Sequence, residues 1–202
     1  MDIAFLQRGL IIGISIAAPV GPISLLCMRR TLAEGRLSGI VSGLGAATAD
    51  ALFGCVAGFG LTFISNILVD QQTWLRLIGG LFLCYLGIKT LRARPAKQAG
   101  VAEGTGLIGA YASTLFLTLT NPMTILSFAA FFAGLGLANT GGSFMSAGAL
   151  VLGVFIGSSL WWITLSGGVG LFRERLDQQG LQWVNRISGA IITGFGLVAL
   201  LS

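Results

Sequence analysis

Asp50 is the one charged residue in a long hydrophobic stretch that runs from Leu37 to Ile64. No other charge lies within thirteen residues of it on either side. A carboxylate in the middle of a membrane helix costs about 2.5–3.5 kcal/mol on insertion scales. A residue in that position needs a partner, a proton or a function, so Asp50 is the first guide to what the chain does.

Composition identifies the surroundings of this carboxylate as a lipid bilayer. Of the 202 residues, 54% are hydrophobic and 9% are charged, whereas a soluble domain carries about a quarter charged residues. The 31 glycines, many of them inside apolar runs, are typical of membrane helices that pack backbone to backbone. We therefore expect an all-α integral membrane protein. Its basic residues lie in short hydrophilic gaps, which indicates contact with membrane lipid and not with nucleic acid.

Residue types that support enzymatic chemistry are scarce. The chain has no histidine, so the commonest metal ligand and the commonest general base are both missing. Its three cysteines, Cys27, Cys55 and Cys84, fall inside apolar segments, which is typical of packed, inert thiols. The sequence predicts neither an enzyme nor a resident cofactor or metal site.

Six segments are long and apolar enough to cross a bilayer, which takes about 20 residues. They are 4–28, 37–65, 73–91, 107–137, 144–171 and 182–201. The first has no basic head and continues past Pro22 to Arg29-Arg30, so we interpret it as a span and not as a signal peptide. Ten Lys and Arg residues lie in the first, third and fifth gaps or at the span ends beside them, and two, Arg8 and Arg76, lie on the opposite side. The positive-inside rule then places both termini outside, with Arg29 and Arg30 anchoring the first span at the cytoplasmic surface.

The chain forms one transporter-like domain, 1–202, with two similar halves. Residues 1–91 hold three spans, residues 92–106 form a charged cytoplasmic linker, and residues 107–202 hold three more spans. Because three is odd, the second repeat must be inverted relative to the first. Gly21-Pro22 interrupts the first span and Asn121-Pro122 interrupts the fourth. Paired interruptions of this kind are the best sequence indication of a transporter's binding site.

Each interruption also contains the start of a new helix. Proline is favoured at the first helical position, behind an N-cap such as glycine or asparagine. Each second half-helix then presents backbone amides and a positive dipole end inside the membrane, where an anionic group binds well. The predicted substrate-binding residues are Gly21, Pro22, Ser24, Asn121, Pro122 and Thr124. The alternative is that both prolines only shape the helix bundle.

Asp50 shares a helix face with a row of small residues. Gly35, Gly39, Gly43 and Ala47 recur every four residues, which lets a neighbouring helix approach closely. Asp50 follows Ala47 by three residues, so we expect it to face the protein interior and to take up and release a proton during transport. The alternative is a structural hydrogen bond from a protonated Asp50 to a neighbouring helix. Ser158, Ser159, Trp161 and Trp162 are weaker candidates for the lining of a path.

These motifs, in this order, resemble the lysine exporter (LysE) family of amino-acid effluxers. The resemblance rests on Pro19-Val20-Gly21-Pro22, the glycine-rich stretch that ends at Asp50, and Asn121-Pro122 followed by Phe131-Phe132. It implies a small secondary transporter of the cell inner membrane that exports an amino acid or a related zwitterion with the proton gradient, as a homo-oligomer. Ile23-Ser24 replaces the Gln-Asn pair of basic-amino-acid exporters, and Met123 replaces the lysine of homoserine and threonine exporters, so neither substrate transfers.

Other functions fit the residues less well. A divalent-metal exporter of the same fold superfamily is the main alternative, but hard cations favour several carboxylates, and Asp50 is the only one in the core. A thiol electron carrier needs cysteines in both halves, whereas all three lie in residues 1–91. A scaffold without transport activity leaves Asp50 and the paired interruptions unexplained.

Overall fold

A computed structural model describes residues 3–19, 21–59, 71–92, 106–134, 144–172 and 178–201, and within these ranges it contains helices and no strand. The helices of the first half are α1 (Ile3–Ala17), α2 (Pro22–Glu34), α3 (Arg36–Gly58) and α5 (Gln72–Leu91). Those of the second half are α6 (Gly106–Leu119), α7 (Pro122–Gly134), α8 (Phe144–Gly170) and α9 (Gln178–Leu201).

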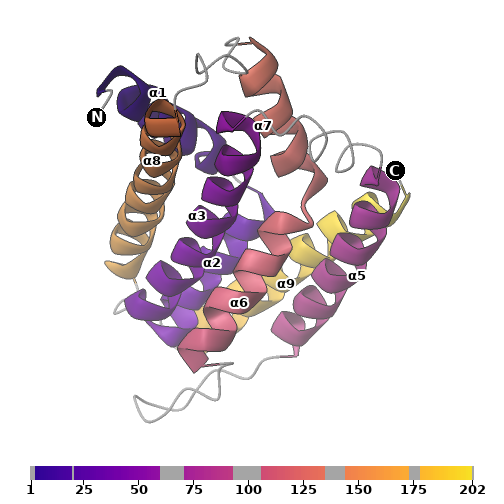
Figure 1. Ribbon diagram of the computed structural model, residues 1–202. Coiled ribbons are helices and arrows are strands. Elements are labelled where there is room, and N and C mark those ends of the chain that lie inside the picture. Colours follow the sequence, from indigo (N-terminus) through magenta and orange to yellow (C-terminus); the bar gives the residue numbers. More distant parts are fainter. Residues whose placement is uncertain are drawn as a thin grey trace.

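The helices form a bundle around α3 (Figure 1). On one side α3 packs against α8, which in turn packs along α1, and on the other side α3 packs against α6. The helices α5 and α9 pack against each other at the edge of the bundle, and α2 lies between α3 and α9. The two halves of the chain are therefore interleaved, because the contacts α1–α8, α5–α9, α3–α8 and α3–α6 each join one helix from the first half to one from the second.

Both predicted interruptions are confirmed. The first separates α1 from α2, whose axes differ in direction by 80°, and the second separates α6 from α7 at Asn121. Judged by length and composition, three helices of the described part can cross a membrane, namely α3, α8 and α9, and the bent pair α1–α2 counts as a fourth. Apolar segments 77–91 and 106–119 are shorter. Six spans remain a prediction, and its ends at residues 60–65 and 135–137, like most of the linker 92–106, lie outside the described residues.

Glycines allow α1 and α8 to touch through their backbones. A Cβ added at Gly9 or Gly13 would overlap the carbonyl oxygen of Leu150 or Val154 on α8. On the facing helix, a Cβ added at Gly153 would overlap the carbonyl oxygen of Leu6. Spacing of four residues between glycines on both helices is the arrangement that brings membrane helices closest together.

Of the predicted row of small residues, Gly39, Gly43 and Ala47 lie on α3 and pack inward as expected, whereas Gly35 is the C-cap of α2, with a φ of 112°, and lies outside α3. A Cβ at Gly43 would overlap the side chain of Trp162, and one at Gly39 would overlap the hydroxyl of Thr31. Ala47, on the same face, is completely buried. This face fixes α3 against α2 and α8 and carries Asp50 into the interior.

The prediction that Arg30 anchors the first span at the surface is wrong. Its side chain is 2% exposed, and its guanidinium nitrogens donate to neutral acceptors at 2.7–2.9 Å. These acceptors are the hydroxyls of Ser42, Ser113 and Thr114 and the carbonyl of Ala110. Arg30 lies on the buried side of α2, which faces α3 and α6. Its hydrogen bonds therefore link α2 to one helix of each half of the chain. Arg29 lies nearer the surface, where its Nη1 donates to Glu34 Oε1 at 2.9 Å.

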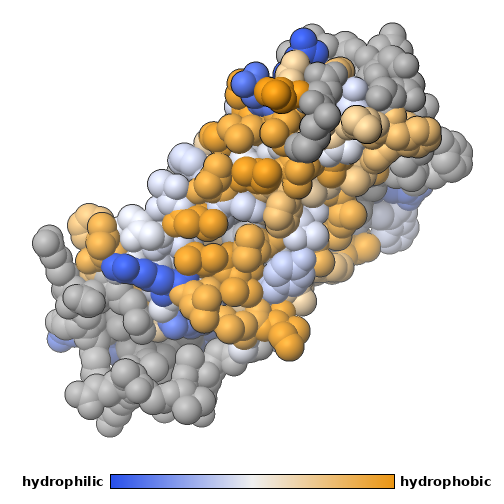
Figure 2. Space-filling view, turned by 60° about the vertical axis from the view of Figure 1, so that its left-hand side comes forward, coloured by the Kyte–Doolittle hydropathy of each residue, from blue (hydrophilic) through white to orange (hydrophobic). Residues whose placement is uncertain are grey.

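The outer surface suits a lipid environment. On the face shown in Figure 2, hydrophobic side chains fill the middle of the molecule, and hydrophilic patches lie nearer its two ends. Large apolar side chains are exposed along the outer faces of α5 and α9, among them Leu81, Tyr85, Ile187 and Ile191. Aliphatic and aromatic side chains in such numbers are stable there because lipid, unlike water, does not penalise their exposure.

Candidate functional site

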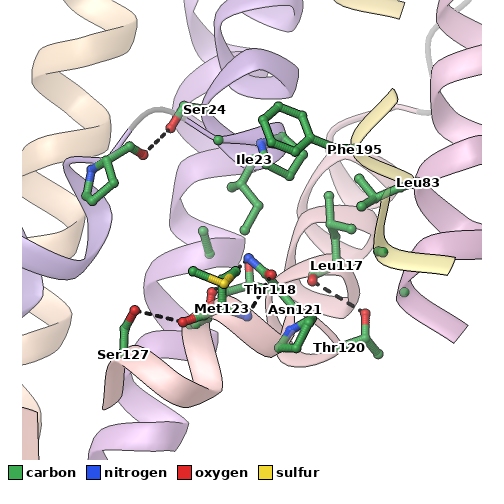
Figure 3. Close-up of a pocket in the computed structure, with 18 of the residues that line it drawn as sticks. Ile23, Ser24, Leu83, Leu117, Thr118, Thr120, Asn121, Met123, Ser127 and Phe195 are labelled. Carbon is green, nitrogen blue, oxygen red and sulfur yellow. Dashed lines mark hydrogen bonds between the residues drawn. The ribbon is translucent and has the colours of Figure 1, made fainter. Parts of the chain in front are cut away.

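A cavity of about 460 Å³ lies between the two helix interruptions. All seven residues predicted from the sequence line it: Gly21, Pro22, Ser24, Asp50, Asn121, Pro122 and Thr124. Figure 3 shows Ile23 from α2 and Asn121 from the second interruption on opposite sides of this space, with Leu83 and Phe195 beside it. Residues separated by about a hundred positions in the chain therefore meet in one place. The volume is in the range of small-molecule sites, about 300–1,000 Å³.

The first interruption ends in a helix N-terminus that no side chain caps. Gly21 is the N-cap of α2, Pro22 occupies the first turn, and Gly21 makes no side-chain hydrogen bond to the helix amides. The first intrahelical bond is from the Leu25 amide to the Gly21 carbonyl, at 3.0 Å. Helix geometry leaves the amides of Ile23 and Ser24 without an intrahelical acceptor. The α2 N-terminus consequently has backbone donors without an intrahelical acceptor at the edge of the cavity.

The second interruption ends in a helix N-terminus that caps itself. The Met123 amide donates to Asn121 Oδ1 at 3.2 Å, and the Thr124 amide donates to the Asn121 carbonyl at 3.1 Å. The other end of the Asn121 amide group donates to Thr124 Oγ1 at 3.0 Å. The two interruptions thus resemble each other in sequence but differ in what they offer, because asparagine has a capping side chain and glycine has none.

Asp50 reaches the cavity from α3 and is 3% exposed. Ser158 Oγ on α8 donates to Asp50 Oδ2 at 2.7 Å, and Trp162 Nε1 donates to Ser158 Oγ at 3.1 Å. An indole N–H can only donate, so Ser158 Oγ accepts from Trp162 and keeps its own hydrogen for Asp50 Oδ2. Arg29–Glu34 is the one ion pair found within the described ranges, so Asp50 has no cationic partner there.

Sequence reasoning missed most of the apolar wall of the cavity. Leu83 from α5, and Phe195 and Val198 from α9, line it beside the predicted polar residues. No sequence signal identifies them, because similar side chains on the same helices face outward. Of the weaker candidates, Trp162 lines the cavity, while Ser158 acts on it through Asp50. Among the described residues, no group of three His, Cys, Asp or Glu could hold a metal ion.

Comparison with known proteins identifies the family. The sequence profile described as "LysE type translocator" matches residues 14–202, which is nearly the whole chain. This chain belongs to the LysE type translocator family. No solved structure matches it significantly.

Relatives of this LysE type translocator include proteins named for amino-acid efflux. A "Putative amino acid efflux protein YcgF" of Bacillus subtilis is 29% identical over 192 residues, covering 93% of this chain and 90% of the relative. A "Threonine efflux protein" of Escherichia coli is 24% identical over 212 residues, with both chains fully covered. An "Uncharacterized membrane protein slr1627" of Synechocystis is also 24% identical, over 93% of this chain and 91% of the relative. The family is one of translocators.

Proposed function

We propose that this chain exports an amino acid, or a closely related zwitterion, across the inner membrane in exchange for protons. The observation that carries the proposal is that one carboxyl group and one uncapped helix N-terminus line the same cavity. These two groups complement the ammonium and the carboxylate of a zwitterion. Family membership and the names of the relatives support transport of an amino acid.

The substrate carboxylate is placed, on this proposal, at the N-terminus of α2. The amides of Ile23 and Ser24 have no intrahelical acceptor, and the helix dipole favours an anion there. Pro22 fixes the start of the helix, and the Ser24 hydroxyl donates to the Pro19 carbonyl at 3.2 Å, which joins the two sides of the interruption. Gly21 leaves room in front of these amides, since a Cβ added there would meet nothing within 4 Å.

The second interruption has a different part in this proposal. Because the first amides of α7 are satisfied by Asn121, this N-terminus attracts an anion less strongly than α2 does. Pro122 starts α7, and Asn121 and Thr124 present polar side chains to the other side of the cavity. We assign these three residues to shaping and closing the site.

Asp50 is proposed to hold either the substrate ammonium or a proton. Its Oδ2 already accepts from Ser158, whose hydrogen is held in that direction by Trp162. The other lone pairs of the carboxylate, both on Oδ1 and one on Oδ2, remain for the proton or the ammonium group. A carboxyl with no cationic partner in the described structure gains from either of these partners, because an isolated buried charge is costly.

An inverted repeat of six spans is part of the same proposal. The backbone contact of Gly45 on α3 with the Tyr111 carbonyl and the Leu115 amide on α6 is repeated by Gly153 on α8, which contacts the Leu6 carbonyl and the Leu10 amide on α1. In an inverted repeat, α3 corresponds to α8 and α6 to α1, so each of these two contacts is the symmetry copy of the other. Asp50 and Ser158, which bond each other, then lie on equivalent helices.

Efflux from vesicles tests the transport function. The purified protein is reconstituted, the vesicles are loaded with a panel of labelled amino acids, and release is measured with and without an inward proton gradient. The proposal predicts that the gradient accelerates release of at least one amino acid. If the gradient changes the release of none of them, proton-coupled export is wrong.

Gly21→Ala tests the site at the α2 N-terminus. Its φ of −136° accepts any side chain, and the added methyl group has room in the fold but would occupy the space before the amides. Loss of one charge-assisted hydrogen bond, about 1.5–3 kcal/mol, raises KM about tenfold to hundredfold. Gly194→Ala on α9 is the matched control, because its methyl group also meets nothing within 4 Å and Gly194 does not line the cavity. Equal KM values for the two variants would show that the substrate carboxylate does not bind at the α2 N-terminus.

A further inference from the structure

The cavity contains an apolar region that neither the carboxylate position nor Asp50 uses. Side chains from α1, α2, α5, α6 and α9 form it, among them Ile16, Ile23, Leu83, Leu117, Phe195 and Val198, and Met123, Leu126 and Trp162 add apolar surface from α7 and α8. Ile23, Leu117, Leu83 and Phe195 surround the same space in Figure 3. A substrate held by its ammonium and carboxylate groups would direct its side chain toward this wall.

The polar side chains around the cavity have mostly used their hydrogen atoms. Four hydroxyl groups that line the cavity donate to nearby backbone carbonyls. They are Ser24 to Pro19, Thr118 to Thr114, Thr120 to Phe116 and Ser127 to Met123. The Asn121 amide group is bonded to Thr124 and Met123. These groups keep acceptor lone pairs, but the donors that remain among them are two, the Thr124 hydroxyl and the second N–H of the Asn121 amide group.

Charge in the cavity is limited to one group. Asp50 is the single ionisable residue among the described residues that line it. A lysine or arginine substrate would bring a second cation with no second carboxylate, and a glutamate or aspartate substrate would bring a second anion with no basic residue. A charge buried without a partner is strongly unfavourable, so both classes are disfavoured.

We infer that the cargo of this exporter is an amino acid with an uncharged, apolar side chain, of the kind found in valine, leucine and methionine. The inference rests on the proposed function, and it concerns the part of the site that binds the side chain. It separates this chain from relatives named for threonine efflux, because threonine differs from valine by a hydroxyl in place of a methyl group. Apolar pockets discriminate between such isosteres by up to about a hundredfold.

A comparison of efflux kinetics between matched amino acids tests the inference. Reconstituted vesicles are loaded with valine, threonine, leucine, lysine or glutamate, and KM and the maximal rate of gradient-driven efflux are measured for each. The ratio of maximal rate to KM should be about tenfold or more higher for valine than for threonine, and higher still relative to lysine and glutamate. If threonine, lysine or glutamate equals valine and leucine, the side-chain inference fails while amino-acid export stands. If no amino acid is released, the proposed function itself fails.

Phe195→Ala provides a second measurement that does not depend on the panel alone. Phe195 lies on α9 and is 41% exposed, so its truncation leaves the bundle contacts of the helix largely intact. If the apolar wall binds the substrate side chain, KM for leucine rises about tenfold while KM for alanine stays unchanged. A rise of the same size for both substrates would show that Phe195 acts on the whole site, and would overturn its role in selecting the side chain.

Discussion

Gly153→Ala is expected to destabilise the contact between α1 and α8. The new Cβ would overlap the carbonyl oxygen of Leu6 and would lie 2.8 Å from the Leu10 amide nitrogen and 3.0 Å from the Gly9 Cα. All three neighbouring atoms belong to the backbone, so no side-chain rotation relieves the overlap and the helices must separate. Overpacking of this kind costs about 1–3 kcal/mol.

Gly148→Ala on the same helix is the matched control, because a Cβ there meets nothing within 4 Å. Both variants gain the same helix propensity, about 1 kcal/mol, so the difference between them isolates the overlap. For a chain of about 200 residues, 1–3 kcal/mol corresponds to a melting temperature roughly 2–12 °C lower for Gly153→Ala. Thermal unfolding of the two proteins in detergent measures this difference. Equal melting temperatures would refute a close backbone contact between α1 and α8.

Three further predictions concern Asp50, the Trp162–Ser158 hydrogen bond beside it, and the hydrogen bonds of Arg30. Asp50→Asn should preserve folding, since an amide also accepts from Ser158, but it should abolish the response of efflux to a proton gradient; a retained response would make Asp50 purely structural. Trp162→Phe keeps an aromatic ring against Gly43 but removes the donor that orients Ser158, so the midpoint of the pH profile of efflux should shift, and an unchanged profile would exclude Trp162 from proton coupling. Arg30→Lys replaces a guanidinium group that donates to four acceptors by a single ammonium group. Each charge-assisted hydrogen bond lost costs about 1.5–3 kcal/mol, so the melting temperature should fall by several degrees. Arg92→Lys, at an exposed position, is its control and should change little, and similar values for the two would show that the Arg30 network contributes little to stability.

The helix interruptions could be predicted because local chemistry dictates them. Proline cannot continue a hydrogen-bonded helix, and a preceding glycine or asparagine is a favourable N-cap. The difference between the two caps was also present in the sequence, since only Asn121 has a side chain that can reach the helix amides. The row of small residues before Asp50 likewise predicted a packed face correctly.

The burial of Arg30 could not be predicted in the same way. Arg29 and Arg30 are adjacent, and which of them faces inward depends on where α3 and α6 lie around α2. The hydroxyls that accept hydrogen bonds from Arg30 belong to serine and threonine residues that no sequence pattern distinguishes, and only the tertiary arrangement brings them together. For a similar reason the sequence does not show which helix packs against each glycine-containing face, because every apolar helix in the chain is a compatible neighbour.

The arrangement of the site also bears on the direction of coupling in the proposed cycle. In the proposed cycle a proton and a substrate ammonium group compete for one carboxyl group, that of Asp50, whose Oδ2 also accepts from Ser158. They cannot occupy it together, because a protonated carboxyl no longer attracts an ammonium group electrostatically. On this proposal, binding of a proton releases the amino acid, and binding of the amino acid requires the proton to leave. Mutual exclusion at one carboxyl group produces exchange and not co-transport, so the proposed cycle uses an inward flow of protons to drive the cargo outward.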